Sequence, residues 1–514
     1  MTGTIAAPTT PVADAPPGRS PRWSRPALVL IAVLALIGLG IRLWVMTGRL
    51  GAIDSDEAIT GLMARHLLDG EFRAFFWRLA YSGTIATYPI ALSFKLFGSS
   101  QFTLELPYLF MSAGAAVCIW RIGVRFLRPF QAVFAALAFW LWPALAIWIG
   151  LKPLIFYVPT LLLGLGVMLC ALRAVERPRN WADWCGLGLL AGAGWWTSPN
   201  IVYFVVPTAL WLAIYHWRSL WPRAALSVPF AILGALPWIW NDVHYGFNSL
   251  EANYGASGGY LDHLGYFFTH ALPAALGLRA PFTGSWIIGT AHLFLYAIVL
   301  GLLAFSIWLG LRDRSLAAIG LLTLPFLFAL IPVASNLDSD FIGNGRYFYF
   351  FAPFLAFAVA RLARPVAPAS VLAVLLAIST VWGFAKINDF RDAIGGGPPL
   401  DRVIATLERQ GHHEVFASFW VSGRLTFESR ERIIAVATDL GPSFQGFEDR
   451  VRRAKLPVYV TTLDPGPFNP LAGLRDRAKA AGITLHETRV GDYLIVVPSR
   501  KLLAPPAFDL STRP

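Results

Sequence analysis

Three acidic residues, Asp54, Asp56 and Glu57, fall within four positions directly after the first long apolar run of the chain. Carboxylates are costly inside lipid, so acids fixed at a membrane surface need either a structural or a chemical role. The structural role is helix capping, because Asp54 and Glu57 have the spacing of a capping box. The chemical role is that of a base, since a carboxylate can accept the proton of an attacking hydroxyl. The spacing leaves both roles open.

The composition predicts a membrane protein. Of 514 residues, 56% are hydrophobic and 14% are charged, which is more apolar surface than a soluble protein of this size can bury. Apolar runs of about 17 to 25 residues are long enough to cross a bilayer, and about eleven of them precede residue 390. The expected spans are 27–46, 104–124, 130–149, 155–173, 183–197, 200–217, 224–240, 286–311, 315–333, 346–361 and 367–386.

The formal charge of +12 does not indicate a nucleic-acid partner, because the basic residues lie in short loops and not in a tail or on one face. Arginine clusters occupy alternate connections between the expected spans. By the positive-inside rule these connections are cytoplasmic, so the loop with the three acids faces outward. An odd number of spans also places the C-terminal region outside. We therefore expect a multi-pass protein of the cytoplasmic membrane, with a cytoplasmic N-terminus.

The chain divides into segments of different composition. Beyond the Gly- and Pro-rich linker, expected helices at 400–410, 444–454 and 471–481 alternate with expected strands at 414–419, 432–437, 457–462, 483–489 and 492–497, which favours a small α/β domain. Two outward loops are long, 47–103 and 241–285. The expected segments are a disordered cytoplasmic tail at 1–26, a membrane domain at 27–386, a linker at 387–399, an extracytoplasmic α/β domain at 400–500 and a tail at 501–514.

The first long loop has a pattern of its own. Apolar residues at helical spacing from Asp56 to Leu68, with Gly70 after them, predict an interfacial helix. Its apolar side is expected in the lipid headgroup region, while Arg65 and Asp69 face water. The apolar residues are Ile59, Leu62, Met63 and Leu67. A shorter apolar segment at 83–97 is expected to lie on the membrane surface.

A family resemblance enters at this loop. The run DSDEAITGLMARHLLDGEFRAFFW, followed by YSGTIATYPIALSFKLFG, resembles the first periplasmic loop of bacterial glycosyltransferases of the GT-C superfamily. These include relatives of the protein O-mannosyltransferases, the aminoarabinose transferases and the Rgt-type lipid A core glycosyltransferases. Asp56 and Glu57 match the family's Asp-Glu pair, and Gly70 and Gly83 match its loop glycines. The run GRYFYFFAPF at 345–354 resembles its late Arg-Tyr segment.

The resemblance implies a fold and an activity. The implied fold is a membrane all-α bundle of about 11 transmembrane helices with interfacial helices, followed by the small C-terminal α/β domain. The implied activity moves a sugar from a polyprenyl-phosphate carrier to a glycan, lipid or protein acceptor on the outer face, with inversion. On this basis Asp56 is the expected base, and Glu57 or Asp54 orients the acceptor or the base.

Cations and polar groups on the outward side complete the expected site. Lys152 and Arg346 are candidates for binding the carrier phosphate, with snorkelling at a helix end as the structural alternative. Tyr347 follows Arg346 in the Arg-Tyr segment. Asp242 and His244, in the second long loop, are candidates for binding sugar or acceptor. No cofactor is expected; the Asp-x-Asp spacing keeps a divalent cation open without favouring one.

Two other readings remain. A transporter or flippase would bind a lipid-linked sugar without chemistry, but such proteins place ionisable residues near the bilayer midplane and are built from repeats. Here the acids gather at the outer rim and no internal repeat is visible. A scaffold that docks a partner through the C-terminal domain would leave Asp56 dispensable. The sugar, the acceptor and the oligomeric state are not encoded in any pattern that we identify.

Overall fold

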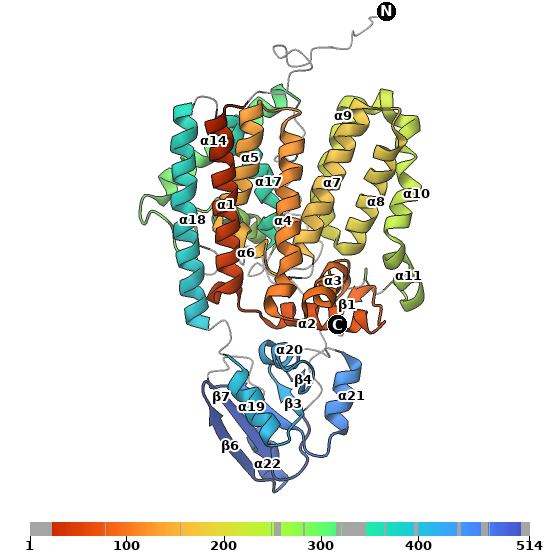
Figure 1. Cartoon of the computed structure of the whole chain (residues 1–514), viewed down its shortest axis with the longest axis vertical. Coiled ribbons are helices and arrows are strands. Elements are labelled where there is room, and N and C mark those ends of the chain that lie inside the picture. The colour runs from red at the N-terminus through yellow and green to blue at the C-terminus, as the bar shows by residue number, and fades with distance from the viewer. Residues whose placement is uncertain are drawn as a thin grey trace, which may run out of the picture.

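The computed structural model of this chain shows a helical bundle joined to a small α/β unit (Figure 1). The structure describes residues 23–314, 320, 346–363, 366–394, 399–438, 444–463, 471 and 473–504, except 78, 155, 248, 251–258 and 281–282. Outside the described residues lie 1–22 of the expected tail at 1–26, the expected span at 315–333 apart from residue 320, and 505–514 of the expected tail at 501–514.

Long helices run side by side through the bundle (Figure 1). They are α1 (Arg25–Thr47), α4 (Gln101–Gly123), α5 (Pro129–Leu141), α7 (Tyr157–Glu176), α8 (Trp181–Thr197), α9 (Val202–Ala224), α14 (His292–Arg312), α17 (Ala352–Leu362) and α18 (Val366–Ile394). Shorter elements join them: η1 (Arg49–Gly51), α6 (Ala144–Ile149), η2 (Pro199–Ile201), α10 (Ser227–Gly234), α11 (Leu236–Tyr245), α12 (Tyr260–Tyr266), η3 (Phe267–Ala271), α13 (Leu272–Ala275) and η4 (Arg346–Phe351).

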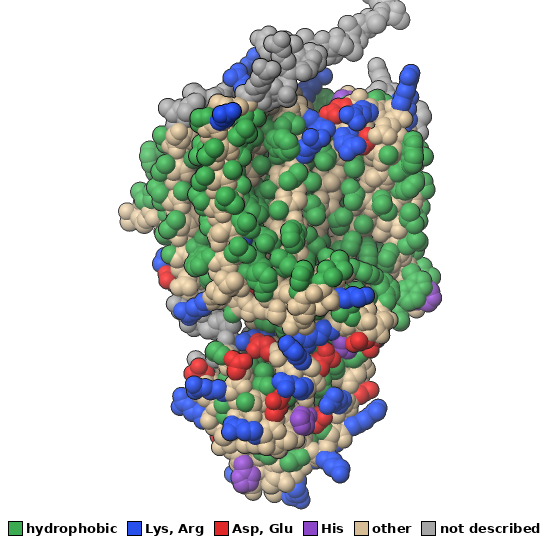
Figure 2. All heavy atoms as spheres, in the orientation of Figure 1, with side chains coloured by type: hydrophobic (Ala, Val, Ile, Leu, Met, Phe, Trp, Pro, Cys, Tyr) green, Lys and Arg blue, Asp and Glu red, His purple; other side chains and the backbone are tan. Residues whose placement is uncertain are grey.

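The surface of the bundle matches a bilayer. Figure 2 shows a wide band of hydrophobic side chains over the visible face of the bundle, with mainly Lys and Arg at its upper edge and mixed charges on the C-terminal unit below. Among the described residues, five helices are long and apolar enough to cross a membrane, namely α1, α4, α7, α14 and residues 369–389 of α18. The chain is therefore a multi-pass membrane protein.

Several expected spans differ from the helices observed. The span at 130–149 divides into α5 and α6 at Pro143, because proline lacks the N–H that would continue the helix. The span at 224–240 divides into α10 and α11 at Ala235. The segment at 346–361 begins as the 3-10 helix η4 and leaves only α17 as α-helix. Helix α18 continues to Ile394, past residue 387 where we expected the linker to begin.

A small layer of structure closes the lower end of the bundle. It contains α2 (Ser55–Leu68), the short antiparallel strands β1 (Phe75–Phe76) and β2 (Leu79–Gly83), and α3 (Thr87–Phe97). Helix α2 ends before Gly70, as expected, and the φ of +90° at Gly70 is one that glycine adopts without strain. Helix α3 is short and packs against α2 and α4.

The C-terminal unit is built on one five-stranded sheet in the order β4-β3-β5-β7-β6. Strands β3 (Glu414–Ala417), β4 (Ile434–Ala437) and β5 (Val458–Thr462) are parallel, while β6 (Leu485–Val490) and β7 (Tyr493–Pro498) add antiparallel pairs. The accompanying helices are α19 (Asp401–Arg409), α20 (Phe419–Glu428), α21 (Gln445–Arg453) and α22 (Leu474–Ala480). Each expected helix and strand here overlaps one observed, although the expected strand at 414–419 ends at Ala417 and α20, which was not expected, begins at Phe419.

Candidate active site

The three acids lie at the start of α2, and two of them form a capping box. The Asp54 carboxylate accepts a hydrogen bond from the Glu57 backbone N–H at 3.1 Å. The Glu57 carboxylate in turn accepts from the Asp54 backbone N–H at 3.1 Å. This arrangement satisfies donors that a helix leaves unpaired at its first turn. Asp54 and Glu57 thus have the helix-capping role that their spacing allowed, and Asp56 is not part of the capping box.

Glu57 also joins a buried ion pair. Its side chain and that of Lys152 are 1% and 2% exposed, with the Lys152 Nζ 3.2 Å from the carboxylate. The same Nζ donates to the carbonyl oxygens of Gly51 at 3.0 Å and Ala52 at 2.9 Å. A lysine ammonium has three donors, and these contacts engage all of them. Lys152 therefore holds the chain before α2 in place, and this geometry does not favour the phosphate contact expected from the sequence.

A second acid completes this buried cluster. Glu105, on α4, lies 3.9 Å from the Lys152 Nζ and is as deeply buried as Glu57. We missed Glu105 in the sequence, although a lone acid near the start of an apolar span is the signal that marks such a residue. The neighbouring backbone adds one more link, because the Thr60 hydroxyl donates to the Pro153 carbonyl oxygen at 3.0 Å. Helix α2 is thereby fixed to the bundle.

Asp56 differs from its two neighbours in exposure. Its side chain is half-buried, whereas Ser55 and Glu57 on either side are fully buried. It lies in the first turn of α2, where the helix dipole favours a negative charge. Asp56 therefore keeps part of its surface exposed at the positive end of the helix dipole, where a ligand can reach it. Asp56 is the acid in this turn best placed to act as a base.

The predicted environment of α2 was wrong. Ile59, Leu62 and Met63 are not in contact with lipid headgroups but are at most 5% exposed within the protein. Arg65 does not face water, because it donates to the Phe427 carbonyl oxygen of α20 at 3.0 Å. The C-terminal unit covers this side of the helix, and the sequence carried no sign of that contact. Only Asp69, at the end of α2, is exposed as expected.

The remaining expected residues lie elsewhere or outside the description. Asp242, on α11, is fully buried, and its carboxylate accepts from the backbone N–H and the hydroxyl of Ser249 at 3.1 and 2.7 Å. It therefore shapes the turn after α11. His244 is exposed, and its Nδ1 lies 2.8 Å from the Trp240 carbonyl oxygen. Arg346 and Tyr347 begin η4. Their side chains are not among those that the structure describes, so the phosphate-binding role expected of this segment stays a prediction.

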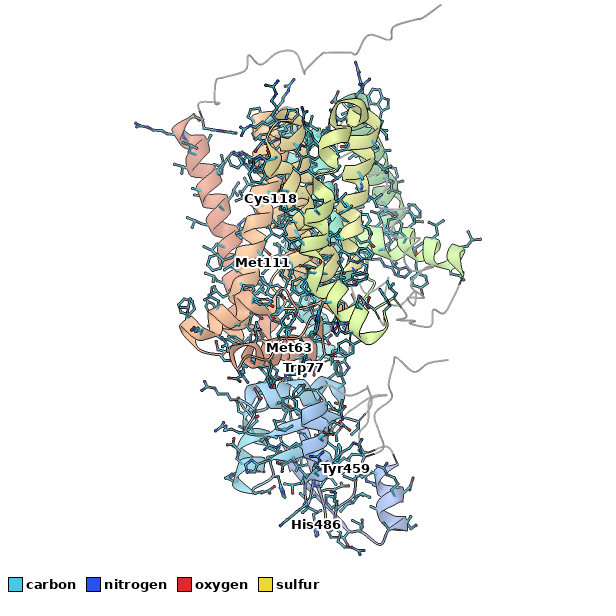
Figure 3. All side chains as sticks on the ribbon, turned by 90° about the vertical axis from the view of Figure 1, so that its right-hand side faces the viewer. Met63, Trp77, Met111, Cys118, Tyr459 and His486 are labelled. Carbon is cyan, nitrogen blue, oxygen red and sulfur yellow. The ribbon has the colours of Figure 1, made fainter. Side chains whose placement is uncertain are left out.

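A pocket opens at the other end of α2. His66 lies in it, and its two ring nitrogens are each 3.1 Å from a carboxylate oxygen, of Glu71 and of Glu431. The hydrogen bond to Glu431, more than the one to Glu71, raises the pKa of His66, although burial opposes the shift. Figure 3 shows Met63 and Trp77 at the end of the bundle that faces the C-terminal unit. The lining residues are Met63, His66, Leu67, Glu71, Phe72, Arg73, Trp77, Thr84 and Thr87.

No metal centre can be built from the described part of the chain. There, no three side chains of His, Cys, Asp or Glu come together in a way that could hold a metal ion. Within the Asp-x-Asp spacing, Asp54 already serves as the helix cap.

Comparisons with known proteins agree with this fold. Residues 83–240 match the family described as dolichyl-phosphate-mannose-protein mannosyltransferase. The structure is similar to that of ArnT from Cupriavidus metallidurans bound to undecaprenyl phosphate, with a TM-score of 0.58 and 14% identity over 93% of this chain and 99% of ArnT. For ArnT in the apo state, the TM-score is 0.56 and the identity 14%, over 92% and 97% of the two chains. A comparison with curated proteins finds no match.

The predicted resemblance to GT-C glycosyltransferases is therefore confirmed. The chain is a multi-pass membrane protein whose fold is similar to that of ArnT over 93% of its length. The family match begins at Gly83 and so does not include the three acids. Their assignment depends on the geometry at α2.

Proposed function

We propose that this protein is a membrane glycosyltransferase that moves a sugar from a polyprenyl-phosphate carrier to an acceptor hydroxyl. The observation that carries the proposal is the placement of the half-buried Asp56 in the first turn of α2, at one end of a bundle with the fold of ArnT. That ArnT structure holds undecaprenyl phosphate, and the family matched at 83–240 is named for a dolichyl-phosphate-linked donor. Carriers of this chemistry and a glycan, lipid or protein acceptor are the partners we infer.

The proposed reaction is a single displacement. The acceptor hydroxyl oxygen attacks the anomeric carbon, and its proton passes to the Asp56 carboxylate. The bond from that carbon to the phosphate oxygen breaks on the opposite side, and the carrier phosphate leaves with the electron pair. Attack from the face opposite the leaving group inverts the anomeric carbon. Glu57 does not accept the proton in this proposal. Its ion pair with the buried Lys152 keeps the first turn of α2, and with it Asp56, in place.

The membrane arrangement in this proposal is the one expected from the arginine clusters. The end of the bundle with α2 and the C-terminal unit faces outward, and about eleven segments cross the bilayer. Topology reporters fused after Gly51 and after Pro399 test this arrangement. Both are expected to give an extracytoplasmic signal, and a cytoplasmic signal from either would contradict the proposed site.

The test of the activity compares wild type with Asp56→Asn in isolated membranes. A panel of polyprenyl-phosphate sugars is offered, and loss of the lipid-linked donor is followed. We expect Asp56→Asn to lower turnover by about 10² to 10⁴, the usual contribution of a general base. The matched control is Asp69→Asn, because Asp69 is an exposed carboxylate at the other end of the same helix. Equal turnover in wild type and Asp56→Asn, at equal protein level, would refute the assignment of the base.

A further inference from the structure

We infer that the C-terminal α/β unit is a working part of the active site, because its helix α20 holds Asp56 in position through Ser55. The inference rests on the proposed function, in which Asp56 is the base. Ser55 is the first residue of α2 and the neighbour of Asp56. It does not touch the reacting atoms, and we therefore describe it as a positioning residue.

Ser55 makes the central contact between the two parts of the chain. Its side chain is fully buried, and its hydroxyl donates to the Phe419 carbonyl oxygen at 2.5 Å. The Ser55 hydroxyl oxygen in turn accepts a hydrogen bond from the Gly423 backbone N–H at 3.1 Å. Both partners lie in the first turns of α20. One hydroxyl thus connects the start of α2 to the start of α20, with donor and acceptor both used.

Two glycines allow the helices to approach this closely. A Cβ atom on Gly423 would lie 2.4 Å from the Ser55 hydroxyl oxygen and 2.9 Å from the Ser55 carbonyl oxygen. A Cβ atom on Gly61, one and a half turns further along α2, would lie 2.4 Å from the ring of Phe427. The contact of Gly423 with the Ser55 carbonyl oxygen would be a clash with backbone, which cannot move aside as a flexible side chain can. The two helices therefore pack closely at both of these positions.

The far end of α2 is held by charges as well. Arg65 lies over the Phe427 ring at 4.2 Å and 3.8 Å from the Glu431 carboxylate. His66 shares the same Glu431 carboxylate. Glu431 follows α20, so this contact and that of Ser55 lie at opposite ends of the same pair of helices. Two separated contacts fix orientation, which a single contact would not.

The opposite side of α2 is fixed to the bundle by the Glu57 and Lys152 pair and by the hydrogen bond from Thr60 to Pro153. Asp56 lies between Ser55 and Glu57, and hence between the two attachments. A base misplaced by about 1 Å loses on the order of 10² in rate. Loosening of the α20 attachment alone is therefore expected to lower turnover while leaving the bundle, and the binding of the carrier, intact.

The test uses the full-length protein with Ser55→Ala and Gly423→Ala, and Ser422→Ala as the control. Ser422 is a buried serine on the same helix whose hydroxyl donates to the same Phe419 carbonyl oxygen at 3.2 Å. We expect kcat to fall about tenfold for Ser55→Ala and about a hundredfold for Gly423→Ala. The KM for the lipid-linked donor is expected to stay within about twofold, and Ser422→Ala to keep the wild-type kcat.

Each other outcome contradicts one specific statement. If Asp56→Asn is inactive while Ser55→Ala and Gly423→Ala keep the kcat of Ser422→Ala, the positioning role is refuted and the proposed function stands. If both variants lose binding of the lipid-linked donor together with turnover, the contact maintains the fold as a whole and positioning is again refuted. If Asp56→Asn itself turns over normally, it is the proposed function that fails.

Discussion

The buried pair of Glu57 and Lys152 allows a prediction whose size follows from the structure. Lys152→Met removes the cation and leaves two carboxylates, of Glu57 and Glu105, buried beside one another. Glu57→Gln removes one negative charge, but an amide oxygen can still accept the Asp54 N–H of the capping box. The lysine then keeps two carbonyl oxygens and Glu105 at 3.9 Å. The two substitutions therefore have unequal costs.

The expected loss in the free energy of unfolding depends on how many buried charges each substitution leaves without a partner. Removing one partner of a buried ion pair costs about 3 to 5 kcal/mol, and we expect Lys152→Met at this level or above it. For Glu57→Gln we expect about 1 to 3 kcal/mol, the cost of one charge-assisted hydrogen bond. The double variant is expected to cost at least about 1 kcal/mol less than the sum, because Glu57→Gln removes one of the two carboxylates that Lys152→Met leaves unpaired, and Lys152→Met removes the ammonium that Glu57→Gln leaves without its closest anion.

The measurement is the free energy of unfolding in mixed detergent micelles, from a titration with a denaturing detergent. The matched control is the pair of Arg125 and Glu176, whose carboxylate side chain is 43% exposed. An exposed pair contributes about 0.2 to 1 kcal/mol, so its cycle is expected to show weak coupling. Costs for Glu57→Gln and Lys152→Met that add within about 0.5 kcal/mol would refute the reasoning.

Two further predictions concern pH and metal. The hydrogen bond to Glu431 raises the pKa of His66 above its usual 6.5. The contact between protonated His66 and Glu431 therefore stabilises the folded protein fully below pH 6.5, and this contribution is lost as the pH rises through the raised pKa. Thermal stability is expected to fall over this pH interval in wild type and to stay constant in His66→Gln. An equal decline in both proteins would show that the His66 imidazole is not the cause of the pH dependence. Chelation with EDTA is expected to leave donor turnover unchanged, since Asp54 caps the helix; turnover restored only by added Mg²⁺ or Mn²⁺ would contradict this.

The sequence predicted the elements of this site better than their contacts. A capping box is a local pattern over four residues, and so the start of α2 could be read directly from Asp54 and Glu57. The same holds for most of the long apolar helices and for the alternating pattern after residue 400. The expected span at 130–149 was wrong for an equally local reason, because Pro143 divides a run that is apolar throughout.

The contacts across the chain could not be predicted because they depend on the fold as a whole. Lys152 and Glu57 are 95 residues apart, and nothing near Lys152 shows which anion it meets. The apolar side of α2 has the same composition whether it meets lipid or α20. The contact with α20 requires Gly423 to lie against Ser55, and a single sequence gives no reason to connect the two positions.

The attachment of α2 to α20 has a consequence for biosynthesis. Ser55 and Phe419 are 364 residues apart, and at about 5 to 20 residues per second the ribosome needs about 20 to 70 s to pass from one to the other. During that time α2 has emerged, but the helix that covers its apolar side has not been made. The membrane surface can shelter Ile59, Leu62 and Met63 in this interval. A chain that stops short of α20 is expected to enter the bilayer without the contact that positions Asp56, and so to consume the lipid-linked donor more slowly.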